Sequence, residues 1–170
     1  MEGNQLTYMT TVDPATLDAY SAGLASLVEI PWLLPVQVTE AGEIYACFAG
    51  ETCYDWPKIC SSKESLLSFM LELVTIAEEA RRYLLNPSLF LRKWEYLYAL
   101  DGKPRFLLIP VVSEDTAEKD LKARFAELLG ASLEYHKGKA WFDGLYRFMT
   151  GEHTATLRQL KQMLYELRFG

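Results

Sequence analysis

Four cations in the middle of the chain are the side chains best suited to binding a ligand. Arg81 and Arg82 end a long apolar-periodic segment, and Arg92 and Lys93 follow the next apolar stretch. Guanidinium groups pair bidentately with phosphate and carboxylate groups, so these residues could together bind a phosphate or an acidic peptide. Cations at the end of a helix also interact favourably with the helix dipole. The sequence favours this second role, in which the cations stabilise a helix end, and ligand binding is the alternative hypothesis.

The sequence contains no complete set of residues for catalysis or for binding a metal ion. The three cysteines form no CxxC pair, and neither His136 nor His153 is close to them along the chain. A zinc site needs about four ligands, commonly in close pairs. Both histidines lie in segments typical of exposed turns, and the glycines form no GxGxxG or Walker A pattern. The sequence therefore predicts no catalytic residue, no metal site and no cofactor.

Aromatic residues suggest two further hypotheses. Trp94, Tyr96 and Tyr98 alternate as on one face of a strand. They could stack on bases, although packing under helices is favoured in so acidic a protein. Tyr54 and Trp56 lie in the segment "ETCYDWPKIC", which is typical of a loop. These two residues are candidates for a protein interface, with burial in the core as the alternative.

Length and composition limit the classes of protein. A chain of 170 residues, 50% of them hydrophobic, can bury the core of one domain. The net charge of −6 argues against a nucleic-acid partner. The N-terminal residues lack the pattern of a signal peptide, and no stretch is long and apolar enough to span a membrane. We expect a cytoplasmic protein without direct membrane insertion, tethered to a membrane or secretion complex only through other domains.

The elements that position these residues follow from hydrophobic periodicity. The first half predicts a strand over "NQLTYMTTV", a helix over residues 14–28, and a hairpin of Leu33–Thr39 and Glu43–Ala49. A helix over 62–84 has the clearest apolar stripe and is stopped by Asn86-Pro87. The strands "WEYLYAL" and "RFLLIPVV" then flank a turn at Asp101-Gly102, and the rest of the chain is helical.

The predicted fold class is α+β, with antiparallel strands in the N-terminal part and a mainly helical C-terminal part. We expect a single domain over residues 1–170, as a fragment of a longer protein. Its β-rich lobe with one helix would occupy residues 1–60. Its helical lobe would occupy residues 61–170 and include the hairpin at about 94–112.

The order of motifs resembles a known bacterial domain. It runs from "IPWLLP" through "LLSFMLELVTIAEEARRYLLNPSLFLRKWEYLYAL" to "FLLIPV". This pattern is similar to a Gram-positive domain of unknown function that is usually found N-terminal to a forkhead-associated (FHA) domain. The resemblance covers nearly the whole chain. It implies that an FHA domain follows as a partner in the full-length protein and reads phosphothreonine.

More distantly, the chain resembles a reduced protein kinase, such as the pseudokinase-like cytoplasmic domain of type VII secretion proteins (EssB/YukC). In that resemblance "LNPSLFL" stands where kinases have the catalytic loop, and "LLIPVV" stands where they have the DFG aspartate. The catalytic aspartate is missing, Asn86 lies on the wrong side of Pro87, and residues 106–112 contain no acidic residue. Residues 1–60 contain neither a VAIK-like lysine nor a Gly-rich loop.

The sequence thus predicts a non-catalytic regulatory or scaffolding domain of a bacterial signalling or secretion-associated protein. It would act through protein partners. The alternative is a pseudokinase-like module that binds a nucleotide or phospho-ligand without turnover.

Overall fold

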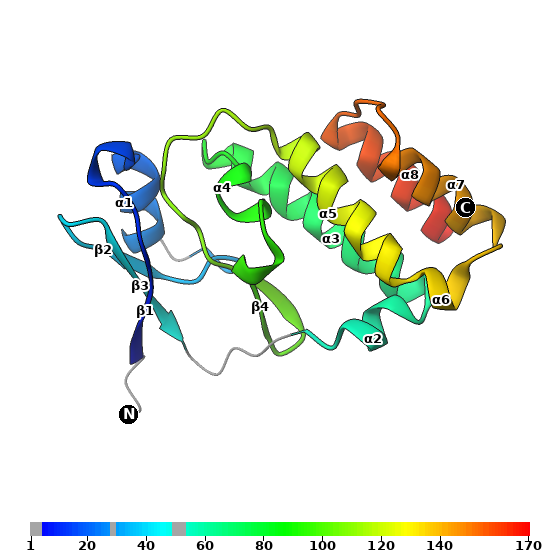
Figure 1. The fold of residues 1–170 in the computed structure, drawn as a ribbon, viewed down its shortest axis with the longest axis horizontal. Coiled ribbons are helices and arrows are strands. Elements are labelled where there is room, and N and C mark those ends of the chain that lie inside the picture. Colours follow the sequence, from blue (N-terminus) through cyan, green and yellow to red (C-terminus); the bar gives the residue numbers. More distant parts are fainter. Residues whose placement is uncertain (1–4, 28–29, 49–53) are drawn as a thin grey trace. The chain divides into compact units, whose positions relative to one another are not determined.

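The computed structural model describes residues 5–27, 30–48 and 54–170, which form two compact units (Figure 1). The sheet unit comprises Met1–Tyr54 and Lys93–Glu114, and the helical unit comprises Asp55–Arg92 and Asp115–Gly170. The α+β fold class is confirmed. The division differs from the predicted boundary at residue 60, since the hairpin at 94–112 belongs with the N-terminal strands.

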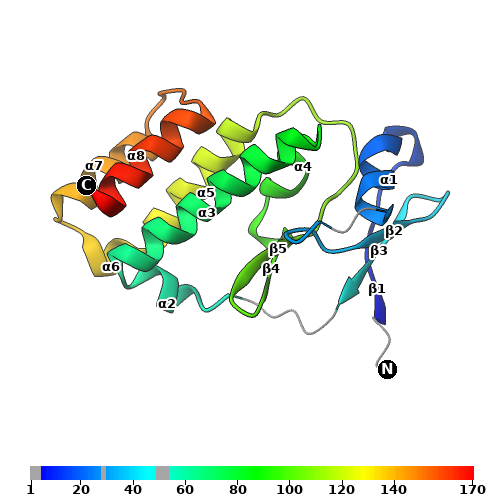
Figure 2. The ribbon, with the colours of Figure 1, turned by 180° about the vertical axis from the view of Figure 1, so that it is seen from behind.

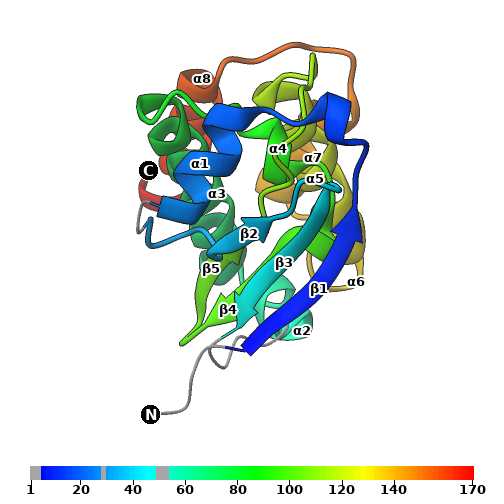
Figure 3. The same cartoon turned by 90° about the vertical axis from the view of Figure 1, so that its left-hand side faces the viewer.

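The sheet unit contains two small antiparallel sheets, which Figure 3 shows from the side of β1. The first has the order β1-β3-β2, and the second is the hairpin β4-β5. The bounds are β1 Gln5–Thr11, 3-10 turn η1 Pro14–Thr16, α1 Ala19–Leu27, β2 Val36–Val38, β3 Glu43–Phe48, 3-10 turn η2 Trp94–Tyr96, β4 Leu97–Leu100 and β5 Lys103–Phe106.

Main-chain hydrogen bonds hold the hairpin and the N-terminal segment in one unit. The Leu34 N–H donates to Phe106 O (2.9 Å), and the Phe106 N–H donates to Trp32 O (2.8 Å). Further along, the Asp18 N–H donates to Pro110 O (2.8 Å). These bonds explain why the strand predicted over Leu33–Thr39 shortens to β2: the backbone at its start bonds to β5 instead.

Two tight turns in the sheet unit depend on residues that tolerate positive φ. Asp101 (φ 52°) and Gly102 (φ 75°) form the two-residue turn of β4-β5, as the sequence predicts. Gly42 has φ 81° in the turn before β3, and a Cβ there would lie 2.0 Å from Val12 O. Only glycine therefore fits at position 42.

Two of the predicted strands and the first helix differ in the structure. Trp94–Tyr96 form the turn η2, so the predicted alternation of Trp94, Tyr96 and Tyr98 on one strand face is wrong. The strand predicted over 105–112 ends at Phe106, and the following Leu107 N–H donates to Tyr96 O of η2 (2.7 Å). The helix predicted over 14–28 is split into η1 and α1, and residue 28 lies outside the described residues.

The helical unit is built on α3, which Figure 2 shows from behind. Helix α3 packs against α8 and α5, and α5 packs in turn against α7 and α4. The bounds are α2 Trp56–Cys60, α3 Lys63–Arg82, α4 Ser88–Leu91, α5 Ala117–Ala131, α6 Leu133–His136, α7 Ala140–Thr150 and α8 Leu157–Phe169. The apolar stripe of α3 is buried from Leu66 to Ala80, which confirms the helix predicted at 62–84 within two residues of each end.

A left-handed leucine ends α3. The Leu85 N–H donates to Ala80 O and the Leu84 N–H donates to Arg81 O, both at 3.0 Å, which is the Schellman pattern. Leu84, the residue that usually is glycine in this motif, has φ 60° and is 80% exposed. The helix thus ends before Asn86-Pro87, at a residue whose conformation is costly for leucine.

We expect Leu84→Gly to raise the free energy of unfolding by about 1 kcal/mol, because it removes the left-handed strain and little contact area. The measurement is urea unfolding followed by circular dichroism, with Leu84→Ala as the control that keeps a Cβ. A loss of stability in Leu84→Gly would show that the exposed leucine makes a contact which outweighs the strain.

Among the described residues, no helix is long and apolar enough to cross a membrane.

Candidate functional site

The segment that corresponds to a kinase catalytic loop in the predicted resemblance is part of the core. Ser88, Leu89, Phe90 and Leu91 are each at most 2% exposed. Asn86 precedes them, and its side chain accepts from the Ser88 N–H (3.0 Å) and donates to Asp115 O (3.3 Å). Its amide is therefore engaged in holding the loop. Ser88 adds one buried hydroxyl, and Leu89, Phe90 and Leu91 are hydrocarbons with no acid–base capacity.

The segment that corresponds to the DFG position is equally apolar and buried. Phe106, Leu107, Leu108 and Ile109 are at most 5% exposed. These side chains belong to the core of the sheet unit and offer no oxygen ligand to a metal ion. Within residues 5–27, 30–48 and 54–170, no group of three or more His, Cys, Asp or Glu side chains is arranged to hold a metal ion.

The four predicted cations have different local surroundings. Arg81 and Arg82 lie in the last turn of α3, and the Arg81 Nη2 is 2.8 Å from Glu118 Oε2 of α5. Arg92 Nε donates to Ser88 O (3.2 Å), while Arg82 is exposed. Lys93 belongs to the sheet unit, where it precedes η2. The arginines thus have the helix-end positions that the structural interpretation describes, and ligand binding by the group remains a prediction.

The two predicted interface aromatics are half-buried and fall in different units. Trp56 begins α2, and its ring meets the ring of Phe69 on α3 edge-on, with centroids 5.6 Å apart. Tyr54 is the last residue of the first segment of the sheet unit. For Trp56 the contact with α3 favours a packing role, and an interface role for either residue stays a prediction.

The histidines are not alike, contrary to the sequence analysis. His153 is exposed, as predicted, and its ring stacks on Phe148 with centroids 6.0 Å apart. His136 is only 2% exposed, so the prediction of an exposed turn residue is wrong. Its Nε2 lies 2.8 Å from Cys60 O at the end of α2. A local sequence pattern could not show this bond, because its partner is 76 residues away.

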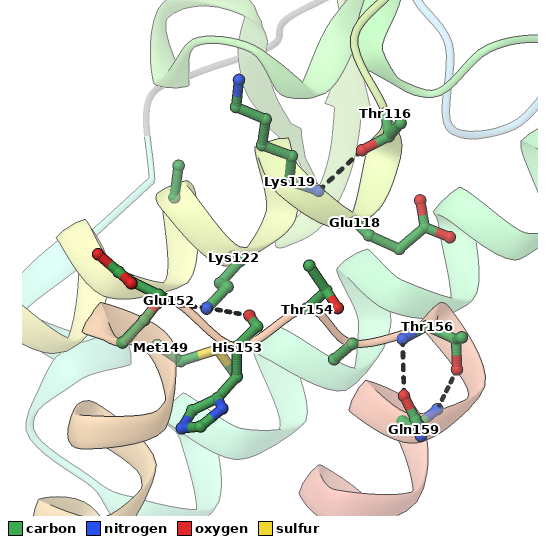
Figure 4. A pocket seen from close by; sticks show the side chains of 13 residues that line it. Thr116, Glu118, Lys119, Lys122, Met149, Glu152, His153, Thr154, Thr156 and Gln159 are labelled. Carbon is green, nitrogen blue, oxygen red and sulfur yellow. Dashed lines mark hydrogen bonds between the residues drawn. The ribbon is translucent and has the colours of Figure 1, made fainter.

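A pocket of about 600 Å³ lies in the helical unit between the start of α5 and the segment that joins α7 to α8 (Figure 4). Lys119 and Lys122 of α5 line it together with Thr116, the N-cap of that helix, and the segment Gly151–Thr156 lines the other side. The Lys122 ammonium donates to the carbonyls of Gly151 and His153, so it fixes the segment. Sequence reasoning missed this pocket, since its walls come from segments that meet only in the fold.

Several polar groups that line the pocket are engaged within the protein itself. Both helix N-termini at its edge are capped by their own side chains, Thr116 accepting from the Lys119 N–H and Thr156 from the Gln159 N–H. Lys119 is the exposed cation of the lining, and Glu118 is already paired with Arg81. Within the described part of the chain, the lining offers polar and cationic groups that suit the binding of a ligand.

The second surface of interest is the outer face of the β1-β3-β2 sheet. Leu6 and Tyr8 of β1 are opposite Cys47 and Tyr45 of β3, so the four side chains share one face. The rings of Tyr8 and Tyr45 meet edge-on with centroids 5.7 Å apart, and the Tyr45 hydroxyl donates to Glu43 Oε2 (2.6 Å). This hydrogen bond, together with partial burial and the negative charge of Glu43, raises the pKa of Tyr45 above its ordinary value.

Comparison with known proteins identifies the fold. No protein-family model matches the chain, and no curated protein matches it. Among solved structures, the cytoplasmic fragment of Staphylococcus aureus EssB matches with a TM-score of 0.51 and 18% sequence identity. The match covers 95% of this chain and 96% of the EssB fragment. The chain therefore has a fold similar to that of the EssB fragment over nearly all of its length. An association with an FHA domain stays a prediction.

Proposed function

We propose that this chain is a non-catalytic scaffolding or regulatory domain of a secretion-associated bacterial protein, acting in the cytoplasm through protein partners. The observation that carries the proposal is the combination of an EssB-like fold with buried hydrocarbons at the positions of kinase catalytic residues. Phosphoryl transfer needs a base or positioning carboxylate and metal ligands in those places. An FHA domain in the full-length protein would be one of the partners.

The apolar and aromatic residues on the surface support a role in protein contacts. Leu6, Tyr8, Tyr165 and Phe169 are between 44% and 60% exposed. Tyr165 and Phe169 are one turn apart on α8, with ring centroids 4.7 Å apart. Aromatic residues are enriched in protein interfaces, where they supply large contact areas at a low cost in conformational entropy.

Mg-ATP is expected to leave the melting temperature unchanged up to millimolar concentration. A nucleotide at ten times its dissociation constant would stabilise the folded state by about 1.4 kcal/mol. For a chain of this size that corresponds to a rise of about 3–6 °C in the melting temperature. The measurement is thermal unfolding across a nucleotide titration, and a saturable rise would contradict the proposal.

The pocket in the helical unit favours one alternative function, a phospho-ligand-binding module without turnover. Its volume of about 600 Å³ is in the range of small-molecule sites, and Lys119 supplies an exposed cation. In this alternative, Lys119→Ala removes any thermal shift that a nucleotide produces. The variant Arg82→Ala tests the predicted cation group separately.

Association with a secretion system is tested by photo-crosslinking in cells of the source organism. A photoreactive residue replaces the exposed Tyr20 in one strain and Tyr165 in another. The expected products join the protein to components of one secretion system, as identified by mass spectrometry. Crosslinks confined to proteins unrelated to secretion would overturn this part of the proposal.

A further inference from the structure

The first third of the chain has an extreme charge distribution. Residues 1–54 contain no Lys, Arg or His, and they contain seven acidic residues: Glu2, Asp13, Asp18, Glu29, Glu40, Glu43 and Glu51. All 17 Lys and Arg residues come later, although the whole chain has a net charge of only −6. The acidic excess of the protein therefore lies in the segment that forms β1, α1, β2 and β3. The side chains of this segment thus contribute only negative charge, and the cations of the sheet unit, Lys93, Lys103 and Arg105, come from the segment around the β4-β5 hairpin.

The outer face of the sheet is apolar and aromatic at the centre of this segment. Leu6 is 44% exposed and Tyr8 is 55% exposed, and both lie on β1 at the edge of the described sheet (Figure 3). The opposite face contributes Val36, Ile44 and Ala46 to the core, each at most 1% exposed. The outer face thus is not needed to bury the core. An exposed apolar patch with a polar edge is typical of a site of interaction.

The carboxylate of Glu43 gives this face its specific chemistry. It accepts the hydrogen bond of the Tyr45 hydroxyl, and the Tyr45 ring contacts the ring of Tyr8. Two tyrosine rings beside a carboxylate form a favourable environment for a guanidinium or ammonium group. The ring faces attract the cation through their quadrupoles, and the carboxylate pairs with it directly.

We propose that the outer face formed by Leu6, Tyr8, Glu43, Tyr45 and Cys47 is the docking site for a basic segment of a partner protein. An Arg or Lys of that segment lies over Tyr8 and pairs with Glu43, and a neighbouring apolar side chain contacts Leu6. The proposal rests on the proposed function as an interaction domain, and it adds the surface and the chemistry of the partner.

The test uses the full chain and a short synthetic peptide in which Arg alternates with Leu. A twin peptide with Glu in place of Arg is the control. Binding is measured by fluorescence anisotropy at several salt concentrations. We expect the Arg peptide to bind, with an affinity that falls as salt is raised, since exposed ion pairs are screened. No binding of the Arg peptide, or equal binding of the Glu peptide, overturns the proposal.

Variants locate the binding on the surface. Tyr8→Ala is expected to weaken binding about threefold to tenfold through loss of the cation–π contact. Glu43→Lys is expected to weaken it more, and Glu43→Gln, which keeps an acceptor for Tyr45, less. Tyr165→Ala and Glu166→Lys on α8 are matched controls, because they remove an equally exposed ring and make the same charge change elsewhere. Circular dichroism confirms that each variant is folded. Equal losses in the controls overturn the proposal.

The alternative occupant that must be tested is a second copy of the chain. If sedimentation shows a dimer that Tyr8→Lys dissociates, the face joins two copies and the proposal is overturned. Failure of the peptide to bind is distinct from failure of the proposed function. Crosslinks from Tyr20 and Tyr165 can identify secretion components even if the peptide does not bind, and the peptide can bind even if no secretion component is found.

Discussion

Phe90→Ala is expected to lower the free energy of unfolding by about 3–5 kcal/mol, the range for truncation of a fully buried phenylalanine. Phe90 is 0% exposed and lies in α4, between Leu89 and Leu91, which are equally enclosed. Removing the ring leaves a cavity that the short helix cannot close by relaxing. The measurement is urea unfolding followed by fluorescence and by circular dichroism, with the two transitions compared.

The matched control is Leu84→Ala, which truncates a leucine that is 80% exposed in the same part of the unit. Its effect should be within about 0.5 kcal/mol of zero. If Phe90→Ala were tolerated as well as Leu84→Ala, the segment would be free to rearrange. Hydrocarbon packing would then not be what occupies the position of a catalytic loop. Leu89→Asp should be worse than Phe90→Ala, because it buries a charge without a partner.

Local sequence patterns predicted the long elements of the fold well. Helix α3 has an apolar stripe over five turns, so its periodicity is clear and tertiary contacts only reinforce it. The Asp101-Gly102 turn was equally predictable, because its left-handed backbone demands these residue types. The predicted strand over Leu33–Thr39 failed in its first half for a different reason. An apolar run shows burial, but it does not show whether the backbone bonds within a hairpin or to Phe106.

The candidate surfaces were less predictable, since they depend on residues far apart in the chain. The pocket joins Lys119 and Lys122 of α5 to the segment before α8, and no pattern within either segment indicates the other. The outer sheet face depends on the register that places Tyr8 opposite Tyr45. One signal was present in the sequence: residues 1–54 lack any cation, and this asymmetry indicates a surface of one sign before its geometry is known.

The similarity to the EssB fragment likewise concerns the fold and not the candidate surfaces. At 18% identity the similarity concerns the arrangement of elements, and side chains at the surface have little reason to agree. A function in protein contacts depends on such surface residues, so each docking surface must be argued from this chain alone. The sheet face and the pocket are therefore separate hypotheses, and each has its own variants.

His136 is the buried polar residue with the largest expected effect on stability. Its Nε2 is 2.8 Å from Cys60 O, and because a carbonyl can only accept, Nε2 carries the proton. Nδ1 is then an acceptor, and it lies 3.3 Å from Lys139 Nζ. The ring also meets Trp141 edge-on, with centroids 5.1 Å apart. Both ring nitrogens thus have partners, and the residue joins the end of α6 to the end of α2.

His136→Ala should lower the free energy of unfolding by about 2–4 kcal/mol, since it removes the packing of the ring and leaves the Cys60 carbonyl unpaired. His136→Phe keeps most of the volume and loses only the hydrogen bonds, so its loss should be about 1–3 kcal/mol. His153→Ala is the control, with an expected change below about 1 kcal/mol because that ring is exposed. Urea unfolding of the three variants measures the loss of unfolding free energy in each, which we expect to be largest for His136→Ala and smallest for His153→Ala. Equal effects of His136→Ala and His153→Ala would mean that the bond between α6 and α2 contributes nothing.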